Sequence, residues 1–219
     1  MLVIGEVLSA QELERVRGGL AGAAFADGRR TAKGAARAVK SNRQADGADP
    51  KVKALAQFVR KALERNALFQ LYARPARHSP ILFNRYGPGD SYGLHTDDPV
   101  MVVEGAGLRT DLSYSLFLSD PETYMGGELV IDDPAGESAV KPPAGSVVVY
   151  STGALHRVSR VTAGERLAAV GWVQSLIRRA DEREVLFDLG RLRAGIETGE
   201  ERLLLDKTIG NLIRLWAEP

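Results

Sequence analysis

The segment that decides the fold of this chain is Tyr86-Gly87-Pro88-Gly89-Asp90-Ser91-Tyr92-Gly93-Leu94-His95-Thr96-Asp97-Asp98-Pro99. Its glycine-proline turn and its closing proline bracket a short piece that we expect to be extended. In an extended chain every second side chain points to the same face, so His95 and Asp97 can reach one ion together. A second histidine, His156, follows fifty-nine residues after Asp97, in a chain with only three histidines.

His95, Asp97 and His156 together predict a metal site. Two imidazoles and one carboxylate form the facial triad that holds non-haem Fe(II) and leaves coordination positions open. The same set could also serve a zinc hydrolase. The third histidine, His78, stands outside the pattern, and we interpret it as a packed or surface residue.

An arginine completes the pattern. Ten residues after His156, Arg166 opens an apolar run that ends at Trp172. A guanidinium can hold a carboxylate through two parallel hydrogen bonds, which a lysine ammonium cannot do, so Arg166 is a candidate anchor for an anionic ligand. If this run is a strand, Trp172 shares a face with Arg166 and is either a wall of the ligand pocket or ordinary core.

Further motifs occur in a fixed order between residues 81 and 175: Phe83-Asn84-Arg85-Tyr86, His95-Thr96-Asp97-Asp98-Pro99, Arg109-Thr110-Asp111-Leu112-Ser113, Leu116-Phe117-Leu118-Ser119, Gly126-Gly127-Glu128-Leu129, Pro143-Ala144-Gly145-Ser146, His156-Arg157-Val158 and Gly164-Glu165-Arg166. With these motifs the chain resembles the Fe(II)- and 2-oxoglutarate-dependent dioxygenases of the prolyl 4-hydroxylase-like branch. Within that branch it is most similar to the bacterial PKHD-type hydroxylases, some of which are associated with iron uptake.

The resemblance implies a role for each site residue. It assigns His95, Asp97 and His156 to Fe(II) and Arg166 to the distal carboxylate of 2-oxoglutarate. Tyr86 becomes a candidate for binding this co-substrate. The implied reaction hydroxylates a substrate with O2 while 2-oxoglutarate is decarboxylated to succinate and CO2, with L-ascorbate as a further cofactor. The substrate could be a small molecule, a peptide or a protein.

Two neighbouring residues have less definite roles. Tyr92 could bond the co-substrate, line the entrance or be structural. Asp98 is expected to support the site or cap a turn, not to act as a fourth ligand.

The strand pattern predicts a β-sandwich or a jelly roll, and the resemblance implies an α+β fold with a double-stranded β-helix, or jelly-roll, core. Short runs rich in apolar and β-branched residues occupy 112–118, 128–132, 146–151 and 166–174, with glycine and proline turns between them. We divide the chain into a mainly helical region at 1–76, a dioxygenase domain at 77–177 and a helical region at 178–219.

The flanking regions carry helical signals. Ser9 with Glu12 predicts a capped helix start, and a second helix is expected near 52–66. Residues 27–50 are interpreted as an irregular, exposed stretch near the mouth of the site. Its basic residues could contact an anionic substrate, although a solvated loop is the simpler interpretation. The basic residues of 27–50 are Arg29, Arg30, Lys33, Arg37, Lys40 and Arg43.

The leucine stripes of 178–219 predict core packing against the barrel or a second subunit, so a homo-oligomer is possible.

Composition limits the partners. The 29 basic and 28 acidic residues give a net charge of +1, so no strong field for nucleic acid or membranes is expected. There is no cysteine, which excludes disulfides and thiolate metal sites and is compatible with a reducing compartment. No apolar run resembles a signal peptide or a membrane span, and we predict a cytoplasmic protein.

Three rival functions stay open. A nucleic-acid repair dioxygenase would carry a second arginine six residues after Arg166, where this chain has Trp172. A zinc hydrolase would give no reason for Arg166. A non-catalytic jelly-roll protein would have no need of an intact ligand set.

Overall fold

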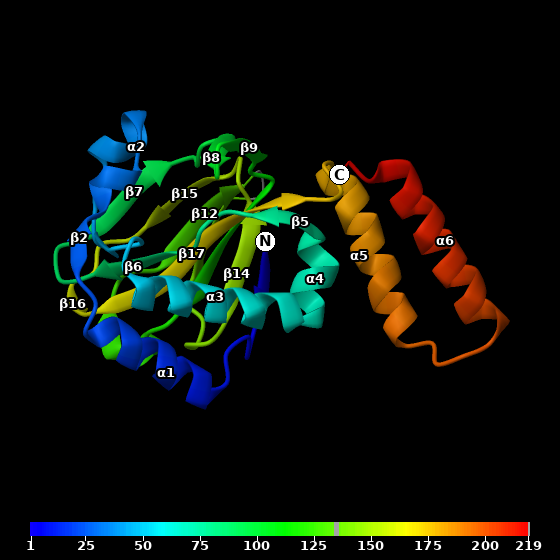
Figure 1. Ribbon diagram of the computed structural model, residues 1–219, viewed down its shortest axis with the longest axis horizontal. Helices are drawn as coiled ribbons and strands as arrows, with labels where there is room; N and C mark the ends of the chain where they lie inside the picture. Colours follow the sequence, from blue (N-terminus) through cyan, green and yellow to red (C-terminus); the bar gives the residue numbers. More distant parts are fainter. Residues whose placement is uncertain (134–135, 219) are drawn as a thin grey trace.

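The computed structural model describes residues 1–133 and 136–218, so the last residue of the predicted C-terminal region lies outside it. Two antiparallel sheets form the jelly-roll core (Figure 1). The larger sheet has eight strands, in the order β1-β14-β10-β17-β6-β4-β2 with β5 beside β17. The smaller sheet has five strands, in the order β13-β12-β15-β7-β3. The predicted α+β jelly roll is confirmed.

The strands of the larger sheet are β1 (Leu2–Ile4), β2 (Phe25–Asp27), β4 (Arg43–Ala45), β5 (Pro75–His78), β6 (Leu82–Tyr86), β10 (Leu112–Phe117), β14 (Val147–Ser151) and β17 (Arg166–Ser175). Those of the smaller sheet are β3 (Lys40–Ser41), β7 (Ser91–His95), β12 (Leu129–Asp133), β13 (Gly136–Val140) and β15 (Leu155–Val158). Two ribbons join β8 (Val100–Val103) to β9 (Ala106–Arg109) and β11 (Tyr124–Met125) to β16 (Ala163–Gly164).

The helices lie outside the barrel. They are α1 (Ala10–Ala21), α2 (Gly34–Ala38), α3 (Pro50–Arg65), α4 (Ala67–Ala73), α5 (Ala180–Ala194) and α6 (Glu200–Trp216), with the 3₁₀ turns η1 (Gly28–Thr31) and η2 (Pro121–Thr123). Ser9 caps α1 through the predicted capping box with Glu12. No helix in the described part of the chain is long and apolar enough to span a membrane.

Alternation along the central strands builds two cores. In β10, Tyr114 and Leu116 point outward and pack with buried residues of α1, α3 and α4. Ser113, Ser115 and Phe117 point the other way, into the barrel, where Phe117 packs against Leu129 of β12. The centre of the larger sheet is therefore buried on both faces, and one of its strands, β14, is an almost continuous apolar run.

Residues 27–50 are largely exposed, as we predicted, but they are not irregular. They contain η1, α2, β3 and β4, and these two short strands extend the two sheets: β4 pairs with β6, and β3 pairs with β7. Lys40, Asn42 and Gln44 are buried. Strands of two or three residues are too short to produce a detectable period, and their inward side chains are polar, so the sequence pattern resembled a loop.

The leucine stripe of α6 does not pack against the barrel, one of the two partners that we predicted, and packing against a second subunit stays a prediction. Leu186 of α5 is buried, and α5 packs against α4, but α6 contributes no buried residue and contacts chiefly α5. The α5–α6 hairpin therefore extends away from the barrel (Figure 1). Its end returns to the sheet, where Glu218 accepts a hydrogen bond from Arg109.

The buried core and the exposed face of α6 predict different losses of stability when a leucine side chain is shortened to alanine. Leu116→Ala should lower the free energy of unfolding by about 2 to 5 kcal/mol, because it opens a cavity in the core. Leu203→Ala on α6, where the side chain is 71% exposed, should change it by less than about 0.5 kcal/mol. Urea unfolding of both variants measures the difference, and equal losses would contradict the assigned packing.

Candidate active site

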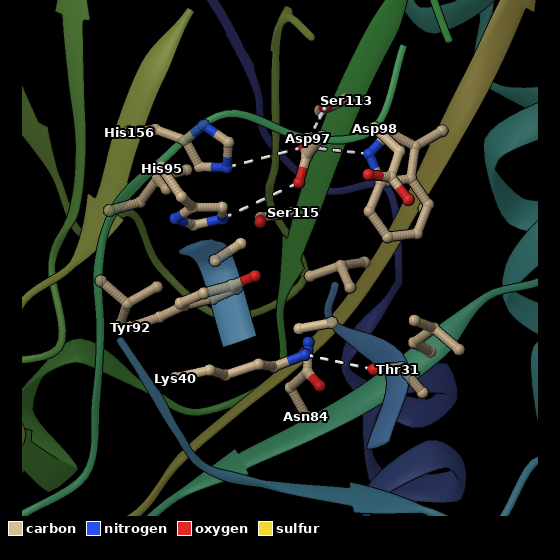
Figure 2. A pocket seen from close by; sticks show the side chains of 18 of the residues that line it. Thr31, Lys40, Asn84, Tyr92, His95, Asp97, Asp98, Ser113, Ser115 and His156 are labelled. Atoms are coloured by element: carbon tan, nitrogen blue, oxygen red, sulfur yellow. Dashed lines mark hydrogen bonds and ion pairs between the residues drawn. The ribbon is translucent and has the colours of Figure 1, made fainter. Parts of the chain in front are cut away.

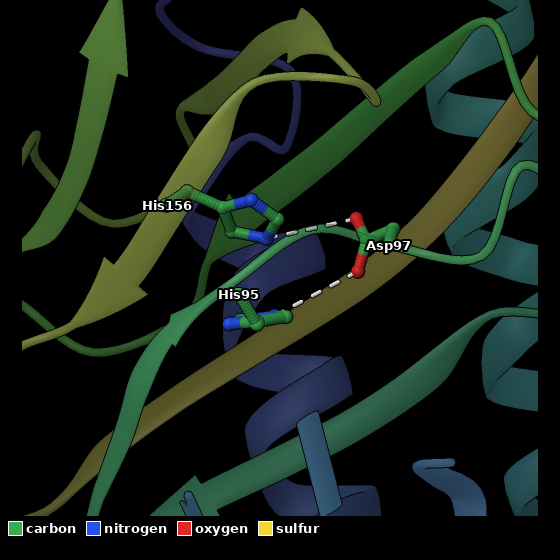
Figure 3. A group of neighbouring side chains, drawn as sticks. All are labelled: His95, Asp97 and His156. Carbon is green, nitrogen blue, oxygen red and sulfur yellow. Dashed lines mark ion pairs between the residues drawn. The ribbon is translucent and has the colours of Figure 1, made fainter. Parts of the chain in front are cut away.

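Strand pairing brings the two predicted histidine ligands together. His95 ends β7 and His156 lies on β15, and the two residues are direct partners across the antiparallel pair. Asp97 follows β7 by two residues. His95 Nε2 lies 3.8 Å from Asp97 Oδ1, and His156 Nε2 lies 3.6 Å from Asp97 Oδ2 (Figure 3). One potential ligand atom from each of the three residues falls within 4.8 Å of the others.

In both histidines the hydrogen bond made by Nδ1 leaves Nε2 as the atom that can bind a metal ion. His95 Nδ1 lies 2.8 Å from the Gly93 carbonyl oxygen, and His156 Nδ1 lies 3.0 Å from that of Ala154. A carbonyl can only accept, so each Nδ1 carries the proton and each Nε2 presents a lone pair. Burial, together with the adjacent His156, lowers the pKa of His95 to about 4. His95 is therefore neutral at pH 7, as a metal ligand must be.

The carboxylate of Asp97 is held by the opposite sheet. Its Oδ2 accepts one hydrogen bond from Ser113 Oγ of β10 at 2.7 Å and one from Trp172 Nε1 of β17 at 2.9 Å. Trp172 also lines the pocket around the triad. Of the two interpretations left open for Trp172, the structure favours the pocket wall, and its indole N–H donates to a candidate ligand.

Arg166 is buried in the same pocket. Its side chain is 1% exposed and lies beside the rings of Tyr86 and Phe117, at 5.3 and 4.8 Å from their centroids. Its Nε and Nη2 have no hydrogen-bond partner among the described residues. Gly127, at φ +70°, leaves room for this side chain, because a Cβ there would stand 3.0 Å from Arg166 Cδ. A buried cation with unused donors fits a carboxylate ligand.

The two tyrosines lie beside these groups. Tyr86 pairs with Arg166 between β6 and β17, and burial raises the pKa of its hydroxyl to about 12, so it stays protonated as a donor. Tyr92 stacks on His95, with ring centroids 3.6 Å apart. Both line the pocket.

Other candidates lie apart from the triad. Asp98 lines the pocket but pairs with Lys33 at 3.9 Å. His78 stacks on Phe69, as a packed histidine would. Arg109 is engaged by Asp111 and Glu218.

Part of the pocket wall was not predicted. Asn84 and Gln44 line it, and so does Lys40, which the sequence placed among loop cations. The predicted proximity of 27–50 to the mouth is confirmed. Five of its six basic residues are exposed as expected, and Lys40 is the exception. Alternation back from Tyr86 could have found Asn84, which shares its face on β6.

Comparison with known proteins agrees with this geometry. A profile of the 2OG-Fe(II) oxygenase superfamily matches residues 81–174. A PKHD-type hydroxylase from a Synechococcus species is 48% identical over 222 residues, covering 100% of this chain and 99% of the relative.

Two solved structures share the fold. A prolyl-4-hydroxylase of Pseudomonas putida aligns with a TM-score of 0.52 and 21% identity, over 80% of this chain and 91% of its own. HygX of Streptomyces hygroscopicus, with nickel and 2-oxoglutarate bound, aligns with a TM-score of 0.53 and 17% identity, over 80% and 83%. On the strength of the profile and the full-length relative, the chain belongs to the 2-oxoglutarate- and Fe(II)-dependent oxygenase superfamily, as an oxidoreductase of the PKHD-type hydroxylase group.

Proposed function

We propose that His95, Asp97 and His156 bind Fe(II), that Arg166 binds the distal carboxylate of 2-oxoglutarate, and that the pocket holds a substrate for hydroxylation. The observation that carries this proposal is the buried Arg166, whose unpartnered donors lie in the same pocket as the three ligands. When bound, the metal and 2-oxoglutarate supply the activation of O2, with release of succinate and CO2. A domain spanning 77–177 would contain all four residues.

Each side chain has a defined task in this proposal. Each histidine is oriented through its Nδ1 by a backbone carbonyl and directs its Nε2 toward the metal, and Ser113 and Trp172 fix the orientation of Asp97. Arg166 orients the co-substrate by its far end, and the Tyr86 hydroxyl is a second donor for it. L-ascorbate as a further cofactor, a cytoplasmic location, a homo-oligomer and a link to iron uptake stay predictions.

The rival functions explain fewer of these features. Zinc hydrolysis needs no carboxylate anchor such as Arg166. In a repair dioxygenase a second arginine would stand where Trp172 bonds Asp97. A non-catalytic barrel would have no use for a buried cation with unused donors, because such a group costs stability unless a ligand pairs with it.

Removing any one metal ligand should abolish turnover. His95→Ala, Asp97→Ala and His156→Ala each delete one of three protein ligands, whereas the stability of the barrel comes chiefly from apolar burial. Succinate release should vanish in each variant while far-ultraviolet circular dichroism stays native. Retained activity in any of the three would contradict the triad. Stoichiometric zinc with hydrolysis and no consumption of 2-oxoglutarate would favour the hydrolase.

Arg166→Ala should weaken 2-oxoglutarate binding by about 2 to 5 kcal/mol, because a desolvated carboxylate loses its charged partner. Arg166→Lys should recover only part of this loss, since it keeps the charge without the planar fork. Anaerobic titration of the Fe(II) form, followed by the metal-to-ligand absorption band, measures both. Arg109→Ala is the control, because Arg109 is already paired with Asp111 and Glu218. If Arg166→Ala binds 2-oxoglutarate as the wild type does and Arg109→Ala binds it more weakly, then Arg109 and not Arg166 holds the distal carboxylate.

Trp172→Phe should lower the affinity for Fe(II) by roughly tenfold to a hundredfold, as is typical when a hydrogen bond to a metal ligand is lost. The phenyl ring keeps the apolar wall but cannot donate to Asp97. Competition with a chelator measures the affinity, and Trp216→Phe on α6 is the control. The same affinity in Trp172→Phe as in the wild type would show that the indole only fills space.

A further inference from the structure

Lys40 is a buried cation on the wall of the active-site pocket. It lies on β3 opposite Tyr92 of β7, and its residue is only 7% exposed. Its Nζ lies 5.0 Å from the centroid of the Tyr92 ring and 3.2 Å from Thr31 Oγ1. Figure 2 shows Lys40 and Thr31 on one side of Tyr92, with His95 and Asp97 on the other.

The charge of Lys40 has no carboxylate partner. Within residues 1–133 and 136–218 no acidic oxygen comes within 4.0 Å of its Nζ, and the bond to Thr31 is its one hydrogen bond. An ammonium has three donors, so two are left for a ligand. Burial lowers the pKa of Lys40 to about 8, although Asp97 opposes the shift. The side chain is still mainly protonated at pH 7, in a place where an unpaired charge is costly.

The charges of the proposed complex leave Lys40 without a counterion. Asp97 and the two carboxylates of 2-oxoglutarate balance Fe(II) and Arg166. The other acidic residue of the pocket, Asp98, is paired with Lys33. A group that brings its own negative charge is therefore needed beside Lys40.

We propose that Lys40 binds a carboxylate of the primary substrate, which makes the substrate class an organic acid; this inference rests on the proposed function. Gln44 supports it, because this residue lines the same pocket and its buried Nε2 has no partner among the described residues. The hydroxyl of Thr31 accepts one hydrogen bond from the Lys40 ammonium, which helps to fix its position. Lys40 thus selects the substrate by its carboxylate, which it holds across Tyr92 from the metal ligands, while the rest of the substrate extends toward them.

The test uses acetate as the carboxylate probe and acetamide as its uncharged counterpart. The protein carries Mn(II) in place of Fe(II), and N-oxalylglycine, an unreactive analogue of 2-oxoglutarate, fills the co-substrate site. Bound acetate should show saturable enhancement of its methyl proton relaxation by Mn(II). Acetamide should bind at least about tenfold more weakly, because it lacks the charge that pairs with the ammonium.

Lys40→Met should reduce the affinity for acetate by at least about tenfold and leave that for N-oxalylglycine within about twofold. Lys53→Met, on the exposed face of α3, is the matched control and should behave as the wild type. The midpoint of thermal unfolding should not fall in Lys40→Met, because methionine fills a similar volume without a buried charge. If that variant does unfold, Lys40→Gln takes its place in the same measurement.

Three results would overturn the inference while leaving the proposed function intact. They are no acetate signal in the wild type, an acetate signal that survives Lys40→Met, and equal binding of acetamide. A loss of N-oxalylglycine affinity above about tenfold in Lys40→Met would also overturn it, by placing Lys40 on the co-substrate. If the wild type holds Mn(II) but not N-oxalylglycine, the proposed function fails together with the inference.

Discussion

The pairing of β7 with β15 is the constraint on which the rest of the site depends. It sets His95 opposite His156, and Asp97 can join them only because the chain leaves β7 toward the larger sheet. There Ser113 and Trp172 hold its carboxylate. The candidate metal centre therefore joins the two sheets, and any slip in the register of β7 against β15 would separate its histidines.

The larger sheet supplies the second requirement, a buried cation in the same pocket as that centre. Arg166 and Trp172 stand on the same face of β17, so one strand carries both the candidate co-substrate anchor and the residue that orients Asp97. Burying Arg166 with unused donors lowers the stability of the protein, and a bound carboxylate would offset this loss by pairing with those donors. The position of Arg166 also requires a glycine at residue 127, since a side chain there would crowd the arginine.

The candidate site residues were predictable from the sequence because their residue types suit metal and carboxylate ligands. Alternation relates His95 to Asp97, ligand chemistry adds His156 and Arg166, and the structure brings all four into one pocket. The long apolar strands were predictable from their runs of apolar and β-branched residues. Lys40 and Gln44 were not, because β3 and β4 are too short to show a period and their partners are distant in sequence. A leucine stripe does not reveal what it packs against, so the sequence alone could not place α6, which packs on α5 and not on the barrel.

The measurement that tests the central claim most directly is a crystal structure of this chain grown anaerobically with Mn(II) and 2-oxoglutarate. The account predicts metal density contacted by His95, Asp97 and His156, and one end of 2-oxoglutarate on the guanidinium of Arg166. Metal bound away from these three side chains, or a co-substrate whose distal carboxylate avoids Arg166, would contradict it.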